Sequence, residues 1–281
     1  MRTLTLLFLV ALIVAPLHAD PYSSLYVIPV VGHTPGANGT NWVSDLAIQN
    51  FQSTPISVSM ILVQSGEGSF DNTSAAGSSV TVPAGGSVLL HDVLSSFPNT
   101  TGALLVGADA PFAVISRAFN TANRVGTGVP PVSDFLESAP GVTNNSTAAA
   151  YVPGLIANAG FRSNLGFVAA TANGAAPMAV QLIIRGADGS TLGSRTFIVP
   201  GGGALEQVQM GTNVLTSSTF DIASAEFRIT SGSGSVVPFA SIVDNITADS
   251  VFVVGMFPPN TLSAKTALPS AFAQAFERLT R

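Results

Sequence analysis

The side chains that could do chemistry are few, and the densest group lies in residues 33–45. This stretch holds His33, Asn41, Asp45 and Trp42, the only tryptophan of the chain. An exposed aromatic ring packs against the apolar face of a sugar, while amide and carboxylate groups bond sugar hydroxyls. These four residues are therefore the candidate ligand-binding residues, and a carbohydrate is the ligand they suit.

The same residues also suit a structural role. Asn-Gly at positions 38–39 favours a tight turn, Trp42 can plug the end of a β-sandwich with its indole N–H bonded, and Asp45 can accept loop amides. Phe161, which occupies the equivalent position in the repeat described below, favours packing. The sequence leaves both interpretations open.

The remaining residues do not predict a catalytic or metal-binding set. The chain has 3 histidines and no cysteine, and it contains neither His-Glu-x-x-His nor Gly-x-Ser-x-Gly. Its 15 acidic residues are scattered, mostly beside turn formers. We expect no enzyme, no cofactor and no metal. An enzyme with a dispersed carboxylate or metal site stays as an alternative. Separately, Asp244, Asn245 and Asp249 are candidate ligands of a structural calcium ion.

The N-terminus predicts export. Met1 and Arg2 form a positive region, residues 4–14 are almost unbroken apolar, and Ala19 offers a cleavage site, so residues 1–19 read as a signal peptide. The apolar stretch is shorter than the ~20 residues that span a bilayer. We expect a secreted protein, at the cell surface or outside the cell with the periplasm as alternative, and no membrane span after cleavage.

Composition restricts the class of protein and of partner. With 47% hydrophobic and 9% charged residues, the chain is not a disordered protein, and without cysteine it is not a disulfide-stapled miniprotein. A formal charge of −5 gives no basic patch for phosphates, so nucleic acid is excluded as a partner. A protein or a cell-surface glycan remains as partner, and a homo-oligomer is compatible.

Short apolar runs with a period of two predict β-strands. Residues 56–63 alternate apolar residues with serine before becoming fully apolar, and residues 179–184 repeat the theme. Val-Pro-x-Gly-Gly at 82–86 and at 199–203 predicts a strand end followed by a turn. The apolar residues 103–119 are interrupted by Asp109 and Pro111, which favours two short strands and a turn.

The chain also repeats itself. Four landmarks recur in order: residues 26–27 match 151–152, 42–46 match 161–165, 81–87 match 198–204, and 116–120 match 241–245. About seven strands per copy predict two tandem immunoglobulin-like antiparallel β-sandwich domains, residues 20–132 and 150–258, joined by a linker at 133–149.

The C-terminal tail, residues 259–281, contains a predicted short helix. Leu268, Phe272, Phe276 and Leu279 share one helical face, and Pro269 suits the first turn. Such a helix either covers an open sandwich end or docks a partner.

Three segments together carry a family resemblance: GANGTNWVSDL at 36–46, VPAGGS at 82–87 and DAPFAVISRAFNT at 109–121. The chain resembles exported bacterial tandem β-sandwich repeats of the immunoglobulin-like kind. The first copy matches the pattern, whereas the second has Phe161 and Asn164 in place of the tryptophan and the aspartate. The resemblance implies architecture and an extracellular setting, and it assigns no activity.

The leading hypothesis is a non-enzymatic exported protein that acts as a structural, adhesive or recognition element at the cell surface or outside the cell. Its basis is a duplicated strand-rich domain with few catalytic groups. The first alternative is a carbohydrate-binding module that uses the Trp42 loop, and the second is the enzyme with a dispersed carboxylate or metal site.

Overall fold

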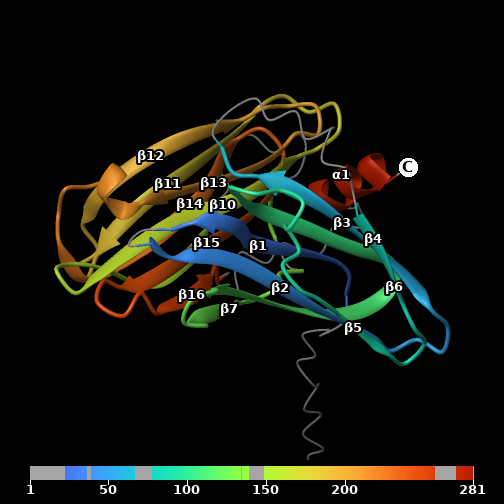
Figure 1. Cartoon of the computed structure of the whole chain (residues 1–281). Coiled ribbons are helices and arrows are strands. Elements are labelled where there is room, and N and C mark those ends of the chain that lie inside the picture. The colour runs from blue at the N-terminus through green and yellow to red at the C-terminus, as the bar shows by residue number, and fades with distance from the viewer. Residues whose placement is uncertain are drawn as a thin grey trace, which may run out of the picture.

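The protein is mostly antiparallel β-structure with one short C-terminal helix, as the sequence predicts (Figure 1). The computed structural model describes residues 23–36, 39–66, 78–133, 135–138, 149–256 and 270–280. The predicted signal peptide and most of the predicted linker lie outside these residues. No helix among the described residues has the length and apolar character that a membrane crossing requires. We call residues 23–133 the first half and residues 149–256 the second half.

The first half forms a 7-stranded sheet with the order β4-β3-β6-β1-β2-β5, in which β7 pairs with β6, and β6 also pairs with β2. Its strands are β1 (Ser23–Pro35), β2 (Asn41–Asn50), β3 (Ile56–Gln64), β4 (Ser78–Val82), β5 (Ser87–Leu90), β6 (Thr100–Asn120) and β7 (Gly126–Val129).

The second half forms two sheets, with the orders β12-β11-β14-β9 and β13-β10-β15-β16. Its strands are β9 (Ala150–Ala157), β10 (Phe161–Thr171), β11 (Met178–Gly186), β12 (Thr191–Val199), β13 (Leu205–Gly211), β14 (Phe220–Ser231), β15 (Gly234–Asp244) and β16 (Ser250–Val254), and a 3-10 turn, η3 (Thr212–Val214), follows β13. Within the predicted linker, β8 (Leu136–Ser138) pairs with β15.

The prediction of two short strands in residues 103–119 is wrong, because β6 is one continuous strand of 21 residues. Up to Ala108 it pairs with β3, and from Phe112 onward it pairs with β2. Pro111 has no N–H to donate, and it falls in the stretch where β6 changes neighbours, so its presence costs no ladder bond there.

The two Val-Pro-x-Gly-Gly motifs form strand ends followed by turns, as predicted. β4 ends at Val82, the first residue of the first motif, and β12 ends at Val199, the first residue of the second. Gly85, with a φ of 61°, and Gly202, with a φ of 78°, occupy the left-handed backbone region that glycine adopts without a steric penalty.

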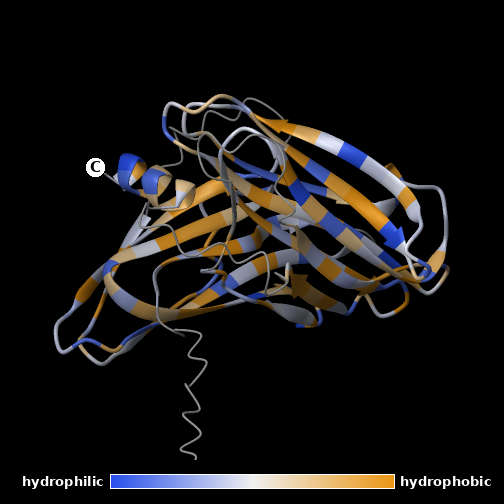
Figure 2. Ribbon diagram, turned by 180° about the vertical axis from the view of Figure 1, so that it is seen from behind, coloured by the Kyte–Doolittle hydropathy of each residue, from blue (hydrophilic) through white to orange (hydrophobic). Residues whose placement is uncertain are grey.

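The fully apolar ends of the predicted strands are explained by burial on both faces. On β3, Leu62 packs into the core of the first half, while Ile61 and Val63 face the second half. On β10, Phe167 belongs to the core of the second half, whereas Val168 faces the first half. Strands with solvent on one side alternate instead between hydrophobic and hydrophilic residues (Figure 2).

A third apolar cluster, the junction core, joins the two halves. It contains Leu105 from the first half and Phe239 from the second, both almost fully buried. The backbone also crosses the junction, since the Gly66 N–H donates to the Gln207 carbonyl at 2.9 Å. The halves therefore pack side by side through a continuous apolar interface (Figure 1).

The C-terminal helix α1 (Ala271–Thr280) closes one end of the junction core, which confirms the predicted helix and its apolar face. Phe272 is fully buried, and Phe276 and Leu279 pack beside it; Leu268 and Pro269 lie outside the described residues. The Ser270 hydroxyl accepts the Ala273 N–H at 3.2 Å and so caps the first turn. Phe135, from the predicted linker, packs on Phe272 with ring centroids 4.8 Å apart.

Candidate functional site

The junction becomes polar at the end away from α1. Along β10, Ala170 and Val168 belong to the junction core, whereas Asn164 and Arg162 line a cavity of about 270 Å³, which we call the junction cleft. Because residues at even positions of one strand share a face, the same face of β10 changes from apolar to polar along its length. The cleft thus lies between the two halves, at the polar end of their interface.

The first half contributes Trp42 to the junction cleft. Trp42 is half-buried, and its indole N–H donates to the Thr40 hydroxyl at 3.1 Å. Gly36 allows this placement, because a Cβ at Gly36 would lie 2.6 Å from the indole nitrogen. The Trp42 ring therefore lines a cavity, and it is neither fully buried in the core nor fully exposed to solvent.

The second half supplies polar groups to the same cavity. Asn164, Gln209 and Ser241 line the cleft from three neighbouring strands, and the Asn164 amide donates to the Ser241 hydroxyl at 3.3 Å. Phe252 closes one side, stacked on Phe239 with ring centroids 5.5 Å apart. An aromatic ring, amides and hydroxyls around one cavity match the hydrogen-bonding groups and apolar faces of a sugar.

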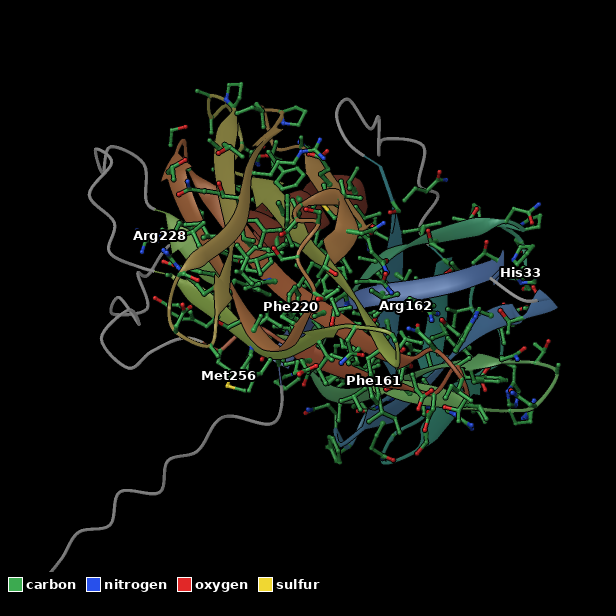
Figure 3. The ribbon with its side chains drawn as sticks, turned by 90° about the vertical axis from the view of Figure 1, so that its left-hand side faces the viewer. His33, Phe161, Arg162, Phe220, Arg228 and Met256 are labelled. Carbon is green, nitrogen blue, oxygen red and sulfur yellow. The ribbon has the colours of Figure 1, made fainter. Side chains whose placement is uncertain are left out.

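Arg162 is the charged residue of the cleft. None of the described residues that line the cleft is an aspartate, glutamate, histidine or lysine. The Arg162 guanidinium donates to Oδ1 of Asn245 at 2.8 Å, and Asn245 in turn donates to the Ala159 carbonyl. Figure 3 shows Arg162 between the two halves and His33 well away from it. The positive charge is thus held in place by a neutral amide.

The structure separates the four predicted ligand-binding residues. Trp42 lines the cleft, whereas His33 and Asp45 belong to a different network. Trp42 and Asp45 are three residues apart on β2, so their side chains lie on opposite faces of the strand. Asn41 uses its backbone N–H to reach Oδ1 of Asn120 at 3.2 Å, and its side chain does not line the cleft.

His33 and Asp45 fix the segment that follows β5. Nδ1 of His33 lies 2.8 Å from Oδ2 of Asp92, whose backbone has a positive φ of 46°. Oδ1 of Asp45 accepts the Asp92 N–H at 3.0 Å, and its Oδ2 lies 3.3 Å from Nδ1 of His91. These contacts hold Asp92 in a backbone conformation that is costly for a residue other than glycine. The role of His33 and Asp45 in this network is therefore structural.

The carboxylates of the candidate calcium ligands stabilise a turn by accepting backbone N–H groups. Oδ1 of Asp244 accepts the backbone N–H groups of Ile246 and Thr247, and these bonds, that of Thr247 first, hold the pKa of Asp244 below its ordinary value. Oδ1 of Asp249 accepts the N–H of Ser250. Within the described part of the chain, no three His, Asp or Glu side chains converge as metal ligands would.

Four residues that line the cleft were not among the predicted ligand-binding residues: Arg162, Asn164, Gln209 and Ser241. The signal was available for two of them, because the repeat aligns residues 161–165 with 42–46 and so places Arg162 and Asn164 beside the equivalent of Trp42. The predicted site lay within one copy of the repeat, whereas the cleft combines side chains of both halves.

No family model matches the chain, nor does any curated protein. Among solved structures, the chain is similar to Bacteroides uniformis beta-glucuronidase 2 covalently bound to cyclophellitol-6-carboxylate aziridine, with a TM-score of 0.19 and 8% sequence identity. The match covers 75% of this chain and 24% of that one, so the chain spans about a quarter of that protein. At this TM-score the likeness carries no argument about fold or activity.

Proposed function

We propose that the chain is an exported recognition protein, without enzymatic activity, that binds carbohydrate in the junction cleft. The observation that carries the proposal is the lining of the cleft, where Trp42 lines the same cavity as amides and hydroxyls of the second half. Of the structural, adhesive and recognition roles that the sequence allows, recognition is the one that a lined cavity supports.

The proposed architecture is a pair of duplicated immunoglobulin-like sandwiches. The strand order β4-β3-β6-β1 in the first half has the same succession as β12-β11-β14-β9 in the second. The latter part of β6 pairs with β2, as β15 pairs with β10. A continuous β6 then corresponds to β14 and β15, which are separated at Gly232. This agreement in pairing supports duplication independently of the sequence landmarks.

The groups around the cleft favour binding over hydrolysis. Glycoside hydrolysis uses two carboxyl groups on either side of the scissile bond. The described lining of the cleft offers amides, hydroxyls, one guanidinium and aromatic rings, and these groups bind a sugar without cleaving it.

The proposal is tested by glycan-array binding followed by calorimetry of the protein and of Trp42→Ala. Because the indole supplies the aromatic surface of the cleft, we expect Trp42→Ala to weaken binding at least about tenfold, or about 1.4 kcal/mol, and Trp42→Phe to retain part of it. Phe51→Ala is the matched control, since Phe51 is an exposed aromatic of the first half that does not line the cleft. Binding to no glycan, or binding unchanged in a folded Trp42→Ala variant, would overturn the proposal.

A further inference from the structure

A second cavity adjoins the junction cleft. This cavity, the end hollow, has a volume of about 380 Å³ and lies at the start of β10 in the second half. Asn158, Asn213 and Asn245 line it together with the hydroxyl-bearing residues 216–219. Arg162 and Asn164 line both cavities, so the end hollow and the junction cleft share a wall.

Each cavity has one aromatic residue near the start of an equivalent strand. Trp42 is the second residue of β2 and lines the cleft, and Phe161 is the first residue of β10 and lines the end hollow. The repeat aligns these two positions, and the Phe161 residue is 37% exposed. The replacement of tryptophan by phenylalanine in the second half therefore keeps an aromatic surface beside a polar cavity.

Arg162 is also the charged residue of the end hollow, so one guanidinium serves both cavities. The ion pairs among the described residues do not include Arg162, whose Nη1 donates to the neutral Asn245 side chain. An arginine oriented by an amide keeps its charge available for a carboxylate or a sulfate, which accept two parallel N–H bonds.

The geometry points to a single extended site in which the junction cleft and the end hollow bind one anionic polysaccharide chain. Sugar rings would pack at Trp42 and at Phe161, and an acidic group between them would bind Arg162. The volume of each cavity is close to the lower end of the range of about 300–1,000 Å³ that is typical of ligand sites. The two volumes together fall well within that range. This inference rests on the proposed function, because it extends the ligand of the cleft.

The test is calorimetric titration with oligogalacturonates of increasing length and with their methyl esters. We expect affinity to rise with length until both cavities are filled, and Phe161→Ala to lower the affinity for long oligomers at least about tenfold while leaving the shortest ones unchanged. Sulfated dextran fragments form a second arm, and tighter binding to them would identify sulfate as the acidic group.

The charge is tested by Arg162→Gln, with Arg195→Gln as the control that removes the same charge from β12 outside both cavities. We expect Arg162→Gln to weaken binding of the acidic oligomers and to leave binding of the methyl esters unchanged. Arg195→Gln should change neither.

The outcomes separate this inference from the proposed function. Binding that depends on Trp42 but not on Phe161, Arg162 or oligomer length would overturn the extended site and leave the cleft as the binding site. The extended site would also be overturned, and the cleft would remain the binding site, if neutral glycans bind in a Trp42-dependent way while neither acidic probe binds. Glycan binding that does not depend on Trp42 would overturn both the extended site and the proposed function.

Discussion

Phe276 of the C-terminal helix lies directly over Gly107 of β6, where a Cβ would stand 2.5 Å from Cζ of the ring. Because so close a contact is not tolerated, Gly107→Ala must displace the ring and loosen α1 from the junction core. We expect a loss of about 1–3 kcal/mol in the free energy of unfolding, measured by urea denaturation. In Gly128→Ala the new methyl group meets nothing nearer than 4.0 Å, so its stability should be unchanged. Equal stabilities of the two variants would contradict the packing of α1 on β6.

Gly36→Ala should disturb the junction cleft and leave the core intact. The new Cβ would lie 2.6 Å from the Trp42 indole nitrogen, so the ring has to move away from Thr40. Trp42 is the only tryptophan, and its emission therefore reports on the cleft alone. We expect a shifted emission maximum and weaker glycan binding with an unchanged melting temperature. An emission spectrum identical to that of the unsubstituted protein would contradict the placement of the ring.

Ser116→Ala should stabilise the protein. The Ser116 hydroxyl is buried and has no hydrogen-bond partner among the described residues. Its neighbours across the strands, Leu46 and Val129, belong to the core of the first half. Removing an unpaired buried hydroxyl should raise the free energy of unfolding by about 1 kcal/mol. A destabilised variant would show that the hydroxyl has a partner.

Asn50→Ala serves as a comparison, because it should lower the free energy of unfolding. The buried Asn50 amide donates to the carbonyls of Thr54, Val82 and Pro83. Its loss leaves these acceptors without that donor, and we expect stability to fall by about 1–3 kcal/mol in the same denaturation assay.

Asp244 should make the turn beside the end hollow sensitive to acid. The backbone N–H groups of Thr247 and Ile246 favour the charged carboxylate and lower the pKa of Asp244 in the folded state. A lowered folded-state pKa gives stability that is fully present above the unfolded-state value of about 3.9 and is lost as the pH falls through the folded-state value. Asp244→Ala should therefore destabilise the protein near neutral pH and have little effect in strong acid.

The pKa of Asp244 itself is measured by NMR titration of its carboxyl carbon. Asp188 is the internal comparison, because the hydroxyl and the N–H of Ser190 lower its pKa in the same way in the turn that joins β11 and β12. A titration of Asp244 at the ordinary carboxyl value would contradict the hydrogen bonds of this turn.

The features of the fold that depend on local sequence patterns could be predicted from the sequence. The apolar face of α1 follows from the spacing of Phe272, Phe276 and Leu279, and the Val-Pro-x-Gly-Gly turns follow from the properties of proline and glycine. Continuous β6 could not be predicted in this way, because Asp109 and Pro111 read locally as a turn. The exchange of neighbours that tolerates Pro111 is a tertiary property.

The site was predictable only in part for a related reason. Trp42 stood out by its rarity, but Gln209 and Ser241 are ordinary residues that become part of a cavity only when β13 and β15 face the first half. His33 and Asp45 stood out by type, and the structure uses them to hold Asp92. Residue type alone did not distinguish a binding role from a structural one.

The most direct test of carbohydrate binding in the junction cleft is a fluorescence titration of the single tryptophan with a glycan that binds in the array. We expect a saturable change in Trp42 emission whose midpoint equals the calorimetric dissociation constant. A glycan that binds with the same constant and leaves the emission of Trp42 unchanged would contradict the account.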